Sequence, residues 1–132
     1  RGGVVDEEAM HSSFCKGQVM AYIIDTWENE PYISLPILKD AFIGTPHIAG
    51  YSADGKCNAS RMALQAVCKF FGIKPDFCIS PPPLPEDIVP AEEAEDQKLQ
   101  LYNPLIDSQA LKGHPEQFEI LRGNYPLRRE HW

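Results

Sequence analysis

Residues 19–25, Val-Met-Ala-Tyr-Ile-Ile-Asp, decide the fold of this chain. The apolar, partly β-branched run 19–24 is long enough for a buried strand, which typically spans about four to eight residues. The run ends in Asp25, and the carboxyl ends of strands in open α/β sheets face the ligand crevice. The segment therefore predicts an α/β fold in which Asp25 lies beside a bound ligand.

A helix before this strand and a second strand after it fit the same fold class. Asp6 is a good N-cap, and the two carboxylates of Glu7 and Glu8 lie in the first turn, where the helix dipole favours negative charge. Gly17 ends that helix. Residues 43–50 then form a second short strand or extended segment, so helices and strands alternate.

The clearest helical pattern follows Ser52, which can cap it, and ends at Gly72. Its apolar residues recur at helical spacing, which predicts a face buried in the core. Residues 81–85 contain four prolines and predict a stiff polyproline connector. A small α-rich tail with short helical patterns follows the connector. The apolar residues of the helix are Ala59, Met62, Ala63, Ala66, Val67, Phe70 and Phe71.

The composition argues against two kinds of partner. The 132 residues carry a formal net charge of −7, with 43% hydrophobic and 23% charged residues. Binding of nucleic acid needs a basic stripe, and basic residues gather only near the end, at Arg122, Arg128 and Arg129. No apolar run approaches the roughly 20 residues of a membrane helix, and no secretory signal is visible. We expect a cytoplasmic protein that binds neither nucleic acid nor membrane.

Scattered cysteines favour free thiols over a metal site. Neither a CxxC pair nor a histidine pair with zinc spacing occurs, and free thiols are usual in a reducing cytoplasm. We therefore expect no metal. A zinc domain would need cysteine and histidine side chains to converge in the fold. The cysteines are Cys15, Cys57, Cys68 and Cys78.

Three charged residues, Arg1, Glu30 and His47, stand where a purely structural role explains them poorly. Taken alone, a histidine in a loop is more often solvated, and Glu30 before Pro31 is most simply a surface carboxylate. Together they suit the oxidation of a 2-hydroxy acid. An imidazole can take the hydroxyl proton, and a carboxylate can fix its tautomer. A guanidinium fork can bind the substrate carboxylate and the developing carbonyl.

Three segments in order strengthen this interpretation. They are RGGVVDEEA at residues 1–9, IDTW at residues 24–27 with Glu30-Pro31, and TPHIAG at residues 45–50. The series resembles the closing signature of the D-2-hydroxyacid dehydrogenases. The resemblance implies an NAD-dependent oxidoreductase in which Arg1, Glu30 and His47 form the catalytic group.

The same resemblance implies further roles. Arg1 and Asp25 would contact the cofactor, with Asp25 holding the nicotinamide carboxamide. Gly50 would let the cofactor approach the backbone closely. Tyr51 would reach a substrate oxygen on the phosphate side. The plainer alternatives are a strand-end cap for Asp25 and an interface aromatic for Tyr51.

Within this family, the chain looks like the branch that acts on erythronate 4-phosphate. The segment GTPHIAGY at residues 44–51 and the tail around residues 118–130 carry that likeness. It implies oxidation of 4-phospho-D-erythronate to the 2-oxo acid, a step toward pyridoxal 5′-phosphate, and a C-terminal dimerisation domain that makes a homodimer. In the tail, Arg128, Arg129 and Glu130 would pair across the dimer or contact the substrate phosphate.

The resulting domain scheme has three parts. Residues 1–50 would be the end of a Rossmann-like NAD-binding domain, and residues 51–80 a helix returning to the substrate-binding domain. Residues 81–132 would be a proline linker and a small α+β dimerisation domain. No GxGxxG fingerprint for the cofactor pyrophosphate occurs in the 132 residues. We therefore expect a fragment, inactive alone, of a longer parent protein.

Two other functions remain open. One is another D-2-hydroxyacid dehydrogenase, such as one acting on 3-phosphoglycerate, which relative rates on the two substrates would distinguish. The other is a non-catalytic dimerising scaffold. An unchanged rate after His47→Ala in the parent protein would favour the scaffold.

Overall fold

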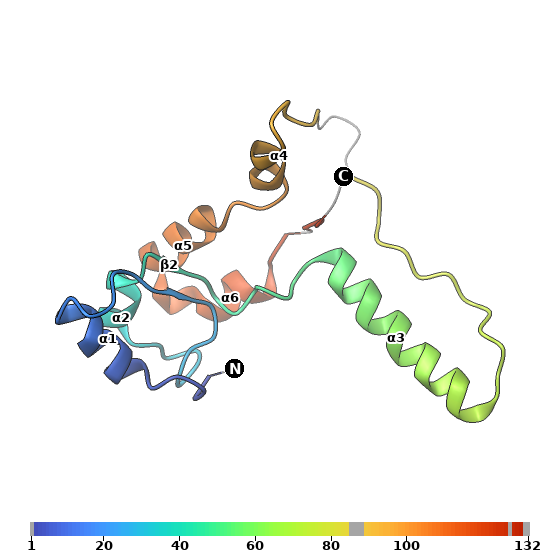
Figure 1. The fold of residues 1–132 in the computed structure, drawn as a ribbon, viewed down its shortest axis with the longest axis horizontal. Helices are drawn as coiled ribbons and strands as arrows, with labels where there is room; N and C mark the ends of the chain where they lie inside the picture. Colours follow the sequence, from blue (N-terminus) through green and yellow to red (C-terminus); the bar gives the residue numbers. More distant parts are fainter. Residues whose placement is uncertain (1, 85–88, 127, 131–132) are drawn as a thin grey trace. The chain divides into compact units, whose positions relative to one another are not determined.

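The chain forms two compact units in a computed structural model that describes residues 2–84, 89–126 and 128–130. Unit 1 combines Arg1–Ala49 with Asn103–Tyr125, and unit 2 combines Gly50–Tyr102 with Pro126–Trp132. Figure 1 shows the elements along the chain. The domain boundaries expected at residues 50 and 80 stay predictions.

Unit 1 holds a small parallel sheet among helices, so the mixed α/β character predicted from the sequence is confirmed for this part. Strand β1 pairs with β2 in register Ile23 to Ile43 and Ile24 to Gly44. The elements are α1 (Glu7–Cys15), β1 (Ile23–Ile24), α2 (Leu35–Asp40), β2 (Ile43–Gly44), α5 (Pro104–Gly113), the 3₁₀ turn Pro115–Gln117 and α6 (Phe118–Gly123).

Both strands are shorter than predicted. The apolar run 19–24 contributes two residues to the sheet, and 43–50 contributes two as well. A strand extends only as far as a neighbouring strand offers backbone hydrogen bonds to it. Within the described residues, β1 pairs with β2 alone. Three backbone hydrogen bonds continue the pairing beside the two strands, from Phe42 to Tyr22 at 2.9 Å, from Thr45 to Ile24 at 3.0 Å and from His47 to Asp25 at 2.8 Å.

The tail supplies part of the core of unit 1. Leu111 in α5 and Phe118 in α6 are 0% and 1% exposed and join the cluster around Trp27. The backbone N–H of Gly44 in β2 donates to the hydroxyl of Ser108 in α5 at 3.0 Å. Residues remote in sequence therefore fix the strand that leads to the predicted histidine.

Unit 2 contains α3 (Ala53–Phe71) and α4 (Ala94–Leu101). The prediction for α3 is confirmed. The Ser52 hydroxyl accepts from the N–H of Gly55 at 2.9 Å, and Gly72 ends the helix with a left-handed φ of 65°.

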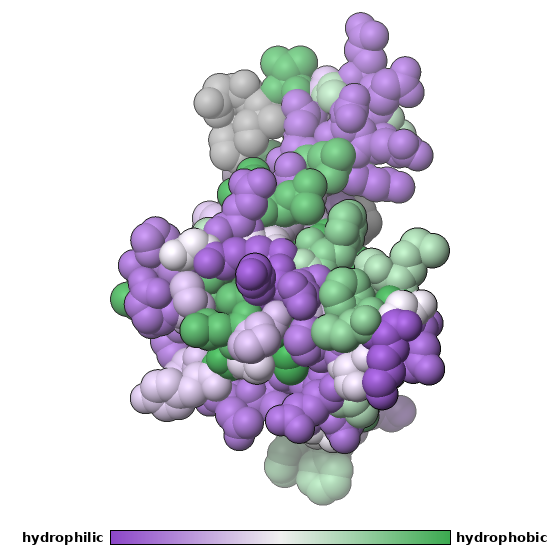
Figure 2. Space-filling view, turned by 90° about the vertical axis from the view of Figure 1, so that its left-hand side faces the viewer, coloured by the Kyte–Doolittle hydropathy of each residue, from purple (hydrophilic) through white to green (hydrophobic). Residues whose placement is uncertain are grey.

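The prediction that the apolar face of α3 is buried is wrong for the structure. Met62, Phe70 and Phe71 are 68%, 83% and 67% exposed, and apolar residues reach the molecular surface elsewhere too (Figure 2). An amphipathic helix needs a second apolar surface, and none of the described residues of unit 2 covers this face. No helix in the described residues is both long and apolar enough to cross a bilayer.

Residues 128–130, near the C-terminus of unit 2, contact the start of α3. The Arg129 guanidinium binds the Asp54 carboxylate through Nε at 2.9 Å and Nη2 at 3.2 Å. This bond lowers the pKa of Asp54. Arg128 lies 4.0 Å from the ring centroid of Tyr102, and the Glu130 carboxylate accepts from the Ser52 hydroxyl. These contacts lie within one chain, and the dimer or phosphate contacts expected for residues 128–130 stay predictions.

Candidate active site

The loop that carries His47 is fixed by Asp25, the residue after β1. Its Oδ1 accepts the Thr45 hydroxyl at 2.7 Å and the N–H of Ile48 at 2.8 Å. Its Oδ2 accepts the N–H of Ala49 at 3.1 Å, and its backbone carbonyl accepts the N–H of His47 at 2.8 Å. The carboxylate thus organises the turn on both sides of the imidazole.

His47 has a left-handed backbone with φ of 57°. Such a φ is uncommon outside glycine, although histidine tolerates it better than most residues. Its neighbours Pro46 and Ile48 are fully buried and hold the conformation. Backbones held in sparsely populated regions cluster at functional sites, so this geometry favours a functional role for the loop.

The structure brings Glu30 and His47 together. His47 Nδ1 lies 2.9 Å from Glu30 Oε2, with side chains 39% and 18% exposed. An ionised carboxylate only accepts hydrogen bonds, so Nδ1 must carry the proton and donate it. In the neutral ring this leaves the Nε2 lone pair available to accept a proton.

Trp27 links the two loops that carry this pair, a role that sequence reasoning did not assign. Its backbone N–H donates to Glu30 Oε1 at 2.8 Å, which occupies the other carboxylate oxygen. Its indole N–H donates to the Thr45 carbonyl at 2.9 Å, and its side chain is 2% exposed. The position of Trp27 two residues after Asp25 was the available signal.

Glu7 is a second residue whose role the sequence did not indicate. It was predicted only as a first-turn carboxylate of α1, yet it is 4% exposed and its Oε1 accepts from the N–H of Glu28 at 2.6 Å. Burial raises the pKa of Glu7, and the nearby carboxylates of Glu28 and Glu30 raise it further. Glu7 therefore holds the Trp27–Glu30 loop through a hydrogen bond to its backbone.

A pocket of about 170 Å³ opens beside Asp25. Its walls combine aliphatic side chains with the carboxylates of Glu7 and Asp25. The lining residues are Gly3, Val5, Glu7, Met10, Ile23, Ile24, Asp25 and Thr26.

The remaining predicted site residues are Arg1, Gly50 and Tyr51. Arg1 lies outside the described residues. Gly50 is exposed, and a Cβ built there meets nothing within 4 Å, so its surroundings in this chain do not require glycine. Tyr51 is half-buried in unit 2, and the Lys56 ammonium lies 4.2 Å from its ring centroid.

Comparison with known proteins supports the resemblance. Residues 1–49 match the NAD binding domain of the D-isomer specific 2-hydroxyacid dehydrogenases. The chain is similar to the erythronate-4-phosphate dehydrogenases of Bacteroides thetaiotaomicron (48% identical) and Bacteroides fragilis (50%) over 98% of its length. The enzyme of that name from Escherichia coli is 33% identical over 98% of this chain.

The chain spans 37% of the length of these relatives. The comparisons confirm the predicted resemblance to the D-2-hydroxyacid dehydrogenases. The description of the matched domain names NAD, in agreement with the predicted cofactor. The roles of the individual site residues stay predictions.

Proposed function

We propose that this chain supplies the proton-accepting part of an NAD-dependent dehydrogenase that oxidises 4-phospho-D-erythronate to the 2-oxo acid. The 2.9 Å contact between His47 Nδ1 and Glu30 Oε2 is the observation that carries the proposal. The names of the similar proteins point to the substrate. On the same grounds we propose that the reaction serves the synthesis of pyridoxal 5′-phosphate.

The proton step follows from the pair. Oxidation at C2 releases the hydroxyl proton, and Nε2 of His47 accepts it. The imidazolium that forms is stabilised by the Glu30 carboxylate on Nδ1, which also keeps the ring from rotating. Trp27 holds that carboxylate through Oε1, so the base enters the reaction already oriented.

The residues fit one end of NAD and not the whole of it. Asp25 Oδ2 accepts one hydrogen bond in the described residues, from Ala49. A carboxylate offers about four acceptor positions in all, so Asp25 can also accept from a carboxamide N–H. We also propose that Gly50 lets the cofactor approach the backbone closely. When bound, NAD supplies the acceptor for the hydride from C2.

The pyrophosphate end of NAD needs residues other than these, since the 132 residues contain no GxGxxG fingerprint. We therefore propose that the chain acts as part of a longer protein, in keeping with the 37% of its relatives' length that it spans.

Substrate binding is proposed for Arg1 and Tyr51. Arg1 would grip the substrate carboxylate with its planar guanidinium fork. Tyr51 would donate to an oxygen on the phosphate side. The Lys56 ammonium 4.2 Å from the Tyr51 ring adds positive charge beside this residue, which favours a phosphorylated substrate.

A cytoplasmic homodimer is the proposed assembly, formed through the domain of residues 81–132. Exposed apolar side chains in this segment support the proposal, because apolar surface left exposed on a protein often takes part in association. These residues are Val89, Leu99, Leu105, Ile106 and Ile120, all at least 46% exposed.

A chimera tests the proposed reaction. These 132 residues would replace the matching segment of the Bacteroides thetaiotaomicron relative, and NADH formation would be followed with 4-phosphoerythronate and with 3-phosphoglycerate. We expect a clear preference for 4-phosphoerythronate. A preference for 3-phosphoglycerate would keep the chemistry and contradict the substrate. A folded chimera that is silent on both, while the unmodified relative is active, would favour the scaffold alternative.

A further inference from the structure

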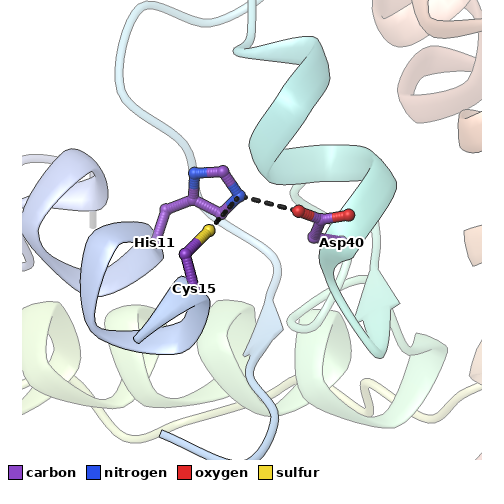
Figure 3. Close-up of side chains that lie close together, drawn as sticks. All are labelled: His11, Cys15 and Asp40. Carbon is purple, nitrogen blue, oxygen red and sulfur yellow. Dashed lines mark hydrogen bonds and ion pairs between the residues drawn. The ribbon is translucent and has the colours of Figure 1, made fainter. Parts of the chain in front are cut away.

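Three side chains capable of binding a metal converge on the surface of unit 1, outside the proposed active site. His11 and Cys15 are four residues apart on α1 and therefore share one face of that helix. Asp40 is the last residue of α2. Figure 3 shows the His11 and Cys15 side chains pointing toward Asp40. The cluster could not be predicted from the sequence, because Asp40 lies 29 residues from His11.

The spacing of the ligand atoms suits one ion. His11 Nε2 lies 2.9 Å from Asp40 Oδ2 and 3.8 Å from Cys15 Sγ, and all three atoms lie within 4.8 Å of one another. Tetrahedral zinc with ordinary bond lengths would separate nitrogen from oxygen by about 3.4 Å and nitrogen from sulfur by about 3.6 Å. The observed distances differ from these by a few tenths of an ångström, which side-chain rotation can supply.

The two helices that carry the ligands are held by aromatic packing. Tyr22 lies edge-on to the ring of Phe14, with centroids 5.3 Å apart, and edge-on to His11 at 6.4 Å. The Tyr22 hydroxyl donates to the carbonyl of Ile37 in α2 at 2.7 Å. The cluster is thus supported by a buried residue that contacts both helices, so little ordering is needed when an ion binds.

Charge and access also favour a cation. The Asp40 carboxylate supplies a negative charge beside the imidazole and the thiol. Cys15 is exposed and the Asp40 side chain is 38% exposed, which leaves a path for the ion and space for a water ligand.

A hydrogen bond at His11 Nε2 joins only two of the three groups fully at one time. His11 Nε2 faces both Asp40 and Cys15, but a neutral imidazole nitrogen has either one proton or one lone pair to offer. An ion at the centre would accept a lone pair from all three ligands at once.

We propose that His11, Cys15 and Asp40 bind one Zn²⁺, with water as the fourth ligand. A borderline-soft ion is the one that suits a set of sulfur, imidazole nitrogen and carboxylate oxygen. The bound ion clamps α1 to the end of α2. The ligand set shares no residue with the proposed proton-accepting pair, so the site is independent of the proposed reaction.

Titration of the metal-free, reduced 132-residue chain with Co²⁺ tests the site. Cobalt reports a thiolate ligand through a charge-transfer band, and Zn²⁺ should displace it. We expect one Co²⁺ per chain. Cys15→Ser should abolish the band, whereas Cys78→Ser, a matched change at another exposed cysteine, should keep it. His11→Gln and Asp40→Asn should each weaken binding by at least about tenfold, and His114→Gln should leave it unchanged.

Circular dichroism of each variant distinguishes ligand loss from misfolding. If Cys15→Ser alters the fold, His11→Gln decides the question on its own. A wild-type chain without the band, a band that survives Cys15→Ser, or equal Co²⁺ affinity for His11→Gln and His114→Gln would each overturn the proposal.

Discussion

Replacing Glu30 by glutamine should invert the tautomer of His47. Glu30 Oε1 accepts the Trp27 N–H at 2.8 Å, and Oε2 accepts the His47 Nδ1–H at 2.9 Å. Glutamine keeps one acceptor and gains an NH₂ donor. The Trp27 amide can only donate, so the glutamine oxygen turns to Trp27 and its NH₂ faces the imidazole. Nδ1 must then accept, and the proton moves to Nε2.

Glu30→Gln should lower the reaction rate far more than it lowers the free energy of unfolding. A positioned general base contributes about 10²–10⁴-fold, and a ring with the proton on Nε2 loses most of that contribution. The hydrogen bond to a charged group is worth about 1.5–3 kcal/mol. Because the two side chains are 39% and 18% exposed, we expect a stability loss of only about 1 kcal/mol.

Nitrogen-15 NMR of the 132-residue chain reads the tautomer directly, above the ordinary imidazole pKa of about 6.5. We expect the His47 proton on Nδ1 in the wild type and on Nε2 in Glu30→Gln. Glu116→Gln is the control, since Glu116 pairs with the exposed His114 at 3.3 Å. A His47 ring that keeps its proton on Nδ1 after Glu30→Gln would refute the reasoning.

Three further changes test contacts within the two units. Gly44→Ala places a Cβ 3.1 Å from the Trp27 ring; this overpacking should cost about 1–3 kcal/mol in urea unfolding, and an unchanged midpoint would contradict it. Asp25→Asn puts an NH₂ against a backbone N–H and should cost about 1–2 kcal/mol, so equal stability would show that the carboxylate does not fix the loop. Arg129 holds the pKa of Asp54 below its ordinary 3.8, so this pair stabilises the fold above that pH and stops doing so as pH falls through the lowered pKa. Urea midpoints measured on acidification should fall less steeply for Asp54→Asn than for wild type, and parallel slopes would argue against the pair.

Local sequence signals predicted the elements whose causes are local. The Ser52 cap and the Gly72 terminus lie within α3 itself, and both were read correctly. The pairing of Glu30 with His47 was predicted from the chemistry of the two residue types and from the family resemblance, and the two loops that carry them do meet in the structure. These features depend on few residues close in sequence.

Features that depend on residues remote in sequence could not be predicted from the sequence. The strand around residue 43 is held by Ser108, 64 residues away, and no periodicity reveals such a contact. The apolar face of α3 predicted a core position, yet Phe70 is 83% exposed, because amphipathicity shows that a helix has an apolar face without showing what covers it. The convergence of His11, Cys15 and Asp40 likewise required the packing of α1 on α2.

The rate of the chimera with His47→Ala tests the central claim most directly. With 4-phosphoerythronate and NAD, the account predicts that NADH formation falls by about 10²–10⁴-fold, while His114→Ala leaves the rate unchanged. Equal rates for the wild-type and His47→Ala chimeras would contradict the account, because the base would then lie elsewhere.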